Sequence, residues 1–174
     1  MEFSIEKSVE ILERTPKTLE VLLNGLSDDW IYNNEGEDTW NVFDVIGHLV
    51  HGEKTDWMER TLIILSSDGN KTFAPFDRFA QFKDSRGKTL QQLLEEFQEL
   101  RTSNLQILKD LQINNSDMKK TGIHPSFGQV TLEQLLSTWV VHDLNHLSQI
   151  SRVLAKQYKD SVGSWEAYLR ILKS

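Results

Sequence analysis

Apolar residues recur at helical spacing along most of the chain and predict four long helices. Side chains that return every three or four residues form one stripe on a helix, and this stripe faces the core. Ser4 and Asn41 are suitable N-caps for the first two helices. Thr89 and Thr131 are each followed three residues later by Gln, the pattern of a capping box. The predicted helices cover about residues 4–26, 41–65, 89–111 and 131–158, and a short C-terminal helix follows residue 164.

Breaks in this pattern define the connections. Pro16 interrupts the first helix and predicts a kink or a break near Thr15. Residues 27–40 and 112–130 are rich in polar and turn-forming residues and are predicted to be loops. Residues 66–88 also lack a regular pattern but contain four Phe residues, which indicates a packed connection. It can extend to about 76 Å, enough to return along the second helix.

These features predict an all-α protein, a four-helix bundle in which a long crossover joins helices two and three. A crossover of this length permits those two helices to lie parallel. The stripe of the third helix consists of Leu and Phe residues and predicts a wall of the core without catalytic groups. The length of 174 residues is typical of one domain, and we expect residues 1–174 to form a single unit.

Charge and composition exclude several classes of function. The net charge is −7, and Lys119-Lys120 is the only basic doublet, so nucleic-acid binding is disfavoured. The chain has no Cys, which excludes disulfides, zinc–thiolate sites and a cysteine nucleophile of its own. No apolar run approaches the ~20 residues that span a bilayer, and the N-terminus does not resemble a signal peptide. These features predict a cytoplasmic protein without a membrane partner.

Candidate chemistry lies on the fourth helix, where His142 and His146 are four residues apart. This spacing places two imidazoles on one face, as a metal ion requires from a single helix. Asp143 lies near the middle of the same apolar stripe. Each polar group buried without a partner would cost about 2–7 kcal/mol. A bound cation would satisfy both imidazoles, and hydrogen bonds to backbone carbonyls are the structural alternative.

The spacing of the other histidines does not select a third ligand. His48 lies more than about 90° from the centre of its helix stripe, which predicts a surface or edge position, and His51 points further out. His124 precedes Pro125 in a predicted loop, where a hydrogen bond to the backbone explains it. Glu53 lies on the apolar face of the second helix and is predicted either to be the partner of a buried polar group or to be exposed at the end of the stripe.

Three segments resemble the DinB-like (YfiT-like) superfamily. Residues 40–49, WNVFDVIGHL, followed by Glu53, resemble its second-helix motif, in which Glu is commoner than the Asp found at position 44. Residues 141–150, VHDLNHLSQI, are similar to its fourth-helix motif, and residues 12–16, LERTP, to part of its first helix. The three segments occur in the family's order and cover nearly the whole chain.

The resemblance implies an up-down-down-up bundle with a three-histidine metal site. Carried over by position, the ligands are His48, His142 and His146. Asp143 would orient an imidazole through a hydrogen bond, or else pair with a buried Tyr or Trp. His51 and His124 match no ligand position.

Three neutral imidazoles leave coordination positions open, as in catalytic metal sites. Zinc and nickel suit such ligands best, and iron and manganese are also compatible. The resemblance implies a metal-dependent enzyme for a small-molecule substrate, either a hydrolase or an S-transferase for a low-molecular-weight thiol. Two alternatives are a non-catalytic metal- or ligand-binding bundle, compatible with a homodimer, and a structural histidine cluster without metal.

Overall fold

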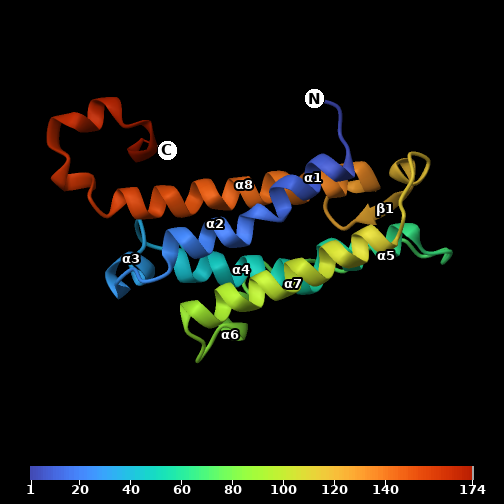
Figure 1. Ribbon diagram of the computed structural model, residues 1–174, viewed down its shortest axis with the longest axis horizontal. Coiled ribbons are helices and arrows are strands. Elements are labelled where there is room, and N and C mark those ends of the chain that lie inside the picture. Colours follow the sequence, from blue (N-terminus) through green and yellow to red (C-terminus); the bar gives the residue numbers. More distant parts are fainter. Residues whose placement is uncertain (174) are drawn as a thin grey trace.

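The computed structural model describes residues 1–173 as a bundle of helices that run along its long axis (Figure 1). No helix in this range is both long and apolar enough to cross a membrane. The elements in chain order are α1 (Ile5–Leu12), α2 (Arg14–Leu23), α3 (Asp28–Tyr32), α4 (Val42–Thr55), α5 (Trp57–Leu65), α6 (Gln81–Asp84), α7 (Leu90–Asp110), η1 (Asp117–Lys119), β1 (Thr121–His124), β2 (Gly128–Thr131), α8 (Leu132–Lys156), η2 (Lys159–Ser161), η3 (Gly163–Tyr168) and η4 (Arg170–Leu172).

Two apolar clusters fill the bundle, one toward each end. The first includes Leu49 and Phe97, and the second includes Trp57 and Trp139. The chain passes from the second cluster to the first along α1 and α2, and back to the second along α4 and α5. Helix α7 also runs from the first cluster to the second, and α8 returns to the first. The order is therefore up-down-down-up, and the crossover makes the second and third long helices parallel. The first cluster includes Leu19, Leu23, Val45, Leu49, Leu93, Phe97, Ile150 and Val153, and the second Leu12, Trp57, Ile64, Leu108, Leu132 and Trp139.

The first two predicted helices are each divided in the structure. The first breaks at Glu13, close to the predicted position, and Pro16 lies in the first turn of α2, where its missing N–H leaves no helical carbonyl unpaired. The second was predicted as one helix over 41–65 but ends at Thr55. Asp56, with φ −120° and ψ −74°, separates α4 from α5. The apolar stripe continues across this break, so periodicity does not reveal it.

The predicted caps are confirmed. Ser4 accepts a hydrogen bond from the Lys7 N–H, and capping boxes open α4, α7 and α8. These caps satisfy backbone N–H groups that have no acceptor inside the helix, and they fix where each helix starts. The histidines on α4 and α8 therefore belong to helices with defined starting points.

The connections contain more structure than the sequence predicted. Residues 27–40 include α3, and the crossover includes α6 and the buried Phe73. The loop 112–130 holds an antiparallel hairpin of β1 and β2, in which His124 pairs with Gly128. The crossover adds an isolated parallel bridge between Thr72 and Ile123. This hairpin is the exception to an otherwise helical fold.

The predicted short C-terminal helix is present as 3₁₀ helix, but most of its predicted packing face is exposed. The chain after α8 forms three short 3₁₀ segments that loop out at the end of the bundle and fold back, so that η4 contacts α8 (Figure 1). Leu172 is buried, but Trp165 and Tyr168, which share its apolar pattern, are exposed. Apolar spacing therefore overestimated how much of this segment packs against the bundle.

Candidate metal centre

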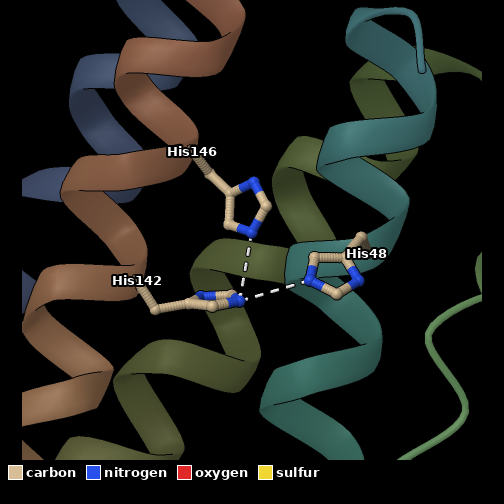
Figure 2. Close-up of side chains that lie close together, drawn as sticks. All are labelled: His48, His142 and His146. Carbon is tan, nitrogen blue, oxygen red and sulfur yellow. Dashed lines mark hydrogen bonds between the residues drawn. The ribbon is translucent and has the colours of Figure 1, made fainter. Parts of the chain in front are cut away.

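Helix α8 positions two of the three candidate ligands. His142 and His146 lie one turn apart on its inner face, as their spacing predicted. His146 is buried, and its ring forms a triangle with those of His142 and His48 (Figure 2). The straight, 25-residue helix thus supplies two imidazoles from one rigid element.

Helix α4 supplies the third, and here the prediction from periodicity is wrong. His48 is only 6% exposed, although its angle on the helix predicted a surface or edge residue. The reason is that α4 is covered on more than one face. The rings of Trp40 and Phe76 pack at 5.0 and 5.5 Å from His48, and α6 lies so close that a Cβ on Gly47 would be 2.5 Å from the Ser85 Oγ.

The three rings converge through their Nε2 atoms. His142 Nε2 lies 3.2 Å from His48 Nε2 and 3.1 Å from His146 Nε2 (Figure 2). One ligand atom from each residue lies within 4.8 Å of the others. Metal–nitrogen bonds at tetrahedral angles would separate the ligand atoms by about 3.3 Å, close to the observed distances. The cluster predicted from the resemblance is therefore present in space.

Burial keeps these imidazoles neutral. It is the main cause that lowers the pKa of His48 to about 3 and that of His142 to about 2, and the neighbouring histidines lower both further. Burial also lowers the pKa of His146, against opposing effects of its hydrogen bond to Gln149 and the charge of Asp143. Neutral imidazole is the form that binds metal ions.

No arrangement of protons on neutral rings satisfies the cluster. His146 Nδ1 lies 2.7 Å from the Gln149 Oε1, so Nδ1 carries the proton and the Nε2 lone pair faces His142. His142 Nε2 can then donate to His146 or accept from His48, but it cannot do both. In addition, the enclosed Nδ1 atoms of His48 and His142 form no hydrogen bond within residues 1–173. A cation among the three Nε2 lone pairs would satisfy them together.

A second polar cluster lies beside the histidines, and the sequence analysis missed its centre. Arg101 on α7 donates to both carboxylate oxygens of Asp143, at 2.7 and 2.9 Å, and to Glu53 Oε1 at 2.8 Å. Glu53 also accepts from the Asn104 amide at 3.0 Å and the Trp139 indole N–H at 2.9 Å. We call these five residues the Arg101 network. Its two carboxylates hold the pKa of Arg101 above the usual value, although burial disfavours the charge.

The contacts of the Arg101 network bear on three predictions from the sequence: those for Glu53, for Asp143 and for the third helix. Glu53 is the partner of a buried polar group, the first of its two predicted alternatives. Asp143 pairs with Arg101 and not with a Tyr, a Trp or an imidazole in the described chain, so it affects the histidines through its charge. The third helix forms a wall of the core, as predicted, but this wall also contains buried polar residues that the prediction did not include. Arg101 and Asn104 lie four and seven residues after Phe97, in phase with the apolar stripe, and this was the signal that could have revealed them.

A cavity of about 770 Å³ opens beside the cluster and is lined by all three histidines. This volume is within the range of small-molecule sites, about 300–1,000 Å³. Aromatic rings form much of the wall near the three histidines, including Trp40 and Phe76 at His48 and Trp57 at 5.0 Å from His142. The histidines are therefore both shielded and accessible to a ligand from one side.

The remaining histidines lie outside the cluster. His51 faces Asp84 of α6, with 3.5 Å between its Nδ1 and the Asp84 Oδ2. His124 accepts hydrogen bonds at Nδ1 from the backbone N–H groups of Ser126 and Phe127, the turn role that was expected for it. It also lines the cavity, which the sequence did not indicate.

Comparison with known proteins identifies the family. The profile of the DinB superfamily matches residues 11–150, most of the chain. The chain belongs to the DinB superfamily. Its motifs on α4 and α8 are those from which the resemblance was drawn, and Gln149, which lies in the second motif and received no role from the sequence, holds the His146 ring.

One DinB-superfamily relative has both a curated sequence and a solved structure. YfiT of Bacillus subtilis (strain 168) is 22% identical over 151 residues, which cover 85% of this chain and 83% of YfiT. The YfiT structure superposes with a TM-score of 0.75 over 91% of each chain. It is described as a probable metal-dependent hydrolase with an unusual four-helix bundle topology. This likeness agrees with the up-down-down-up order found here.

Proposed function

We propose that His48, His142 and His146 bind one divalent metal ion through their Nε2 atoms, and that the protein is a metal-dependent enzyme. The observation that carries the proposal is the convergence of three neutral imidazoles, two buried and one half-buried, on a point where no set of protons satisfies them. Zinc or nickel suits three imidazole ligands best, and iron and manganese are compatible. A metal ion held this way supplies Lewis-acid activation of a water molecule or a small thiol near neutral pH.

The chain's own residues position and protect this centre. The Gln149 amide fixes the orientation and the tautomer of His146. Asp143, held by Arg101, places a negative charge near His146 without a hydrogen bond to the ring. The aromatic walls at His48 and His142 limit the access of water, so a small molecule in the cavity would meet the centre in a partly apolar environment.

Hydrolysis of a small organic molecule is the reaction class that we favour, because a relative of the same fold is described as a hydrolase. Transfer of a low-molecular-weight thiol is the second candidate. The chain has no Cys, so a thiol nucleophile would have to come from a small molecule, and the cavity of about 770 Å³ has room for such a molecule beside an electrophile.

Activity assays on tag-free protein loaded with zinc or nickel test the proposal. One assay follows the hydrolysis of a panel of activated esters and amides. Another follows conjugation of 1-chloro-2,4-dinitrobenzene with and without added cysteine. We expect turnover in one of them, lost by more than about a hundredfold in His142→Ala and retained in Lys54→Met, an exposed residue of α4.

The pattern of turnover separates the candidates. Turnover without thiol supports a hydrolase, and turnover that requires the thiol supports a transferase. Metal binding without turnover in either panel would favour the non-catalytic bundle. Equal turnover in wild type and His142→Ala would contradict the proposal.

A further inference from the structure

One side of the cavity is rich in hydrogen-bond donors that have no acceptor in the protein. It is formed by α5, the crossover and the β1–β2 hairpin, and we call its lining residues the α5 arm. Its polar groups are an indole N–H, a guanidinium and an imidazole N–H, and its apolar groups are two Phe rings. The α5 arm consists of Trp57, Arg60, Phe73, His124 and Phe127.

Trp57 is the donor nearest the histidine cluster. Its side chain is only 4% exposed, and its ring lies edge-on to His142 at 5.0 Å. The indole N–H forms no hydrogen bond with any group in residues 1–173, yet it is not among the fully enclosed polar atoms. Gly52 leaves room for it, since a Cβ there would be 3.4 Å from the indole nitrogen. The N–H is therefore open to the cavity.

Arg60 is the second donor and the only cationic side chain of the arm. It is 8% exposed, its Nε pairs with Asp56, and its guanidinium lies 5.2 Å from the centre of the Phe73 ring. Within the described chain, neither Nη group has a hydrogen-bond acceptor, and neither is enclosed. Asp56 and Phe73 thus hold one edge and one face of the guanidinium and leave its terminal N–H groups available.

His124 is the third donor. Its Nδ1 accepts two backbone N–H groups, so the neutral ring carries its proton on Nε2. Burial, followed by the charge of Arg60, lowers its pKa and favours this neutral form. The ring stacks on Phe127 at 4.4 Å and lies edge-on to Phe73 at 6.4 Å. Arg60 and His124 therefore both contact Phe73, and their donors belong to one small region.

We propose that the α5 arm binds a carboxylate group of the substrate, through Trp57, Arg60 and His124, and holds its carbon skeleton against Phe73 and Phe127. A carboxylate offers about four acceptor sites, and a guanidinium matches two of them in a bidentate pair. Because Asp56 offsets part of the Arg60 charge, the selectivity of the α5 arm for a carboxylate rests on its set of N–H donors as well as on charge. The inference deepens the proposed function, since it places the reacting group of a carboxylate-bearing substrate toward the histidines.

Binding of carboxylates and their matching primary amides to metal-free, tag-free protein tests this inference. The probes are acetate, phenylacetate and 3-phenylpropionate, each against its amide, followed by ¹H–¹⁵N NMR. The Trp57 indole signal is assigned from a Trp57→Phe sample. We expect at least one aromatic carboxylate to shift the Trp57 and His124 signals, with a Kd at least about tenfold lower than that of its amide.

Variants locate the bound group. Arg60→Gln should weaken carboxylate binding by at least about tenfold, and His124→Phe, which keeps the ring stack, by about threefold. Arg78→Gln is the matched control, because Arg78 is an exposed arginine at the His48 side of the same cavity, and we expect less than a twofold change. The double variant Asp56→Asn, Arg60→Gln should also bind weakly, which excludes an unpaired Asp56 as the cause.

Three results would overturn the inference: no binding of any carboxylate up to its solubility limit, equal binding of acids and amides, or unchanged binding in Arg60→Gln. Because the protein is metal-free, none of them depends on the metal centre. A failure here would leave the proposed function untouched, and a failure to bind metal would leave this result interpretable.

Discussion

Two buried polar clusters lie side by side between the apolar halves of the bundle, and they differ in one respect. The Arg101 network consists of three charged and two neutral groups that are almost completely paired with one another. The histidine cluster consists of neutral rings whose converging nitrogens cannot all be satisfied. Glu53, Arg101 and Asp143 of the network lie where helical periodicity expects apolar side chains, whereas His48 of the histidine cluster lies where it expects a surface or edge residue.

This difference in pairing is our reason for assigning a structural role to the Arg101 network and proposing a functional role for the histidine cluster. Buried charges are tolerated when hydrogen-bonded partners compensate for the loss of water, and the Arg101 network supplies its own partners from α4, α7 and α8. It thereby fixes these helices relative to one another, including the two that carry the histidines. The histidine cluster has less internal compensation, because the Nδ1 atoms of His48 and His142 form no hydrogen bond within residues 1–173 and the three Nε2 atoms cannot all be satisfied. This shortage of partners is our reason for proposing it as the functional site.

The largest effect should follow from removing the centre of the Arg101 network. Arg101→Met leaves Glu53 and Asp143 as buried carboxylates without their cation, and we expect it to reduce the free energy of unfolding by about 3–5 kcal/mol. Chemical denaturation of metal-free protein measures this loss. Lys54→Met is the control, because it breaks a partly exposed pair with Glu96 and should cost no more than about 1 kcal/mol. Equal losses of unfolding free energy in the two variants would show that the Arg101 network contributes no more to stability than a surface ion pair.

The histidine cluster should instead make stability depend on pH. The pKa values of His48, about 3, and His142, about 2, lie below the unfolded value of about 6.5. Below pH 6.5 or so the unfolded chain binds protons that the folded chain does not, so the metal-free protein should lose stability as the pH falls. Each such ring contributes up to about 1.4 kcal/mol per pH unit.

The His142→Phe variant isolates one ring. Between about pH 6 and pH 5, its unfolding free energy should fall less steeply than that of wild type, by about 1 kcal/mol per pH unit. Denaturant titrations in a series of buffers give both slopes. Parallel slopes would show that His142 is protonated in the folded protein and would remove the argument that the cluster is neutral.

A smaller effect is expected at Asp143. It should show whether this residue stabilises the fold by pairing with Arg101 or changes the metal affinity of the histidine cluster. Because both of its oxygens accept hydrogen bonds from Arg101, Asp143→Asn should cost stability, by about 1–3 kcal/mol. The metal dissociation constant should rise by no more than about threefold, since the residue reaches the centre only through its charge. A loss of metal affinity larger than the loss of stability would instead assign Asp143 to the metal centre directly.

Sequence reasoning identified those parts of the site that a single helix determines. His142 and His146 follow from their spacing, and the caps follow from local side-chain to backbone hydrogen bonds. His48 was located by resemblance only, because one-stripe periodicity assumes that a helix has a single buried face, whereas α4 is covered by α7, α8 and α6. Pairing between helices is likewise invisible in the sequence, which is why Arg101 and its two carboxylates were not connected.

Calorimetric titration of tag-free, metal-free protein with zinc and with nickel is the most direct test of the central claim. We expect wild type to bind about one equivalent of metal ion, and His142→Ala to bind it with an affinity lower by more than about a hundredfold. Lys54→Met should bind as wild type does. Binding of less than a few tenths of an equivalent, or an unchanged affinity in His142→Ala, would contradict the central claim.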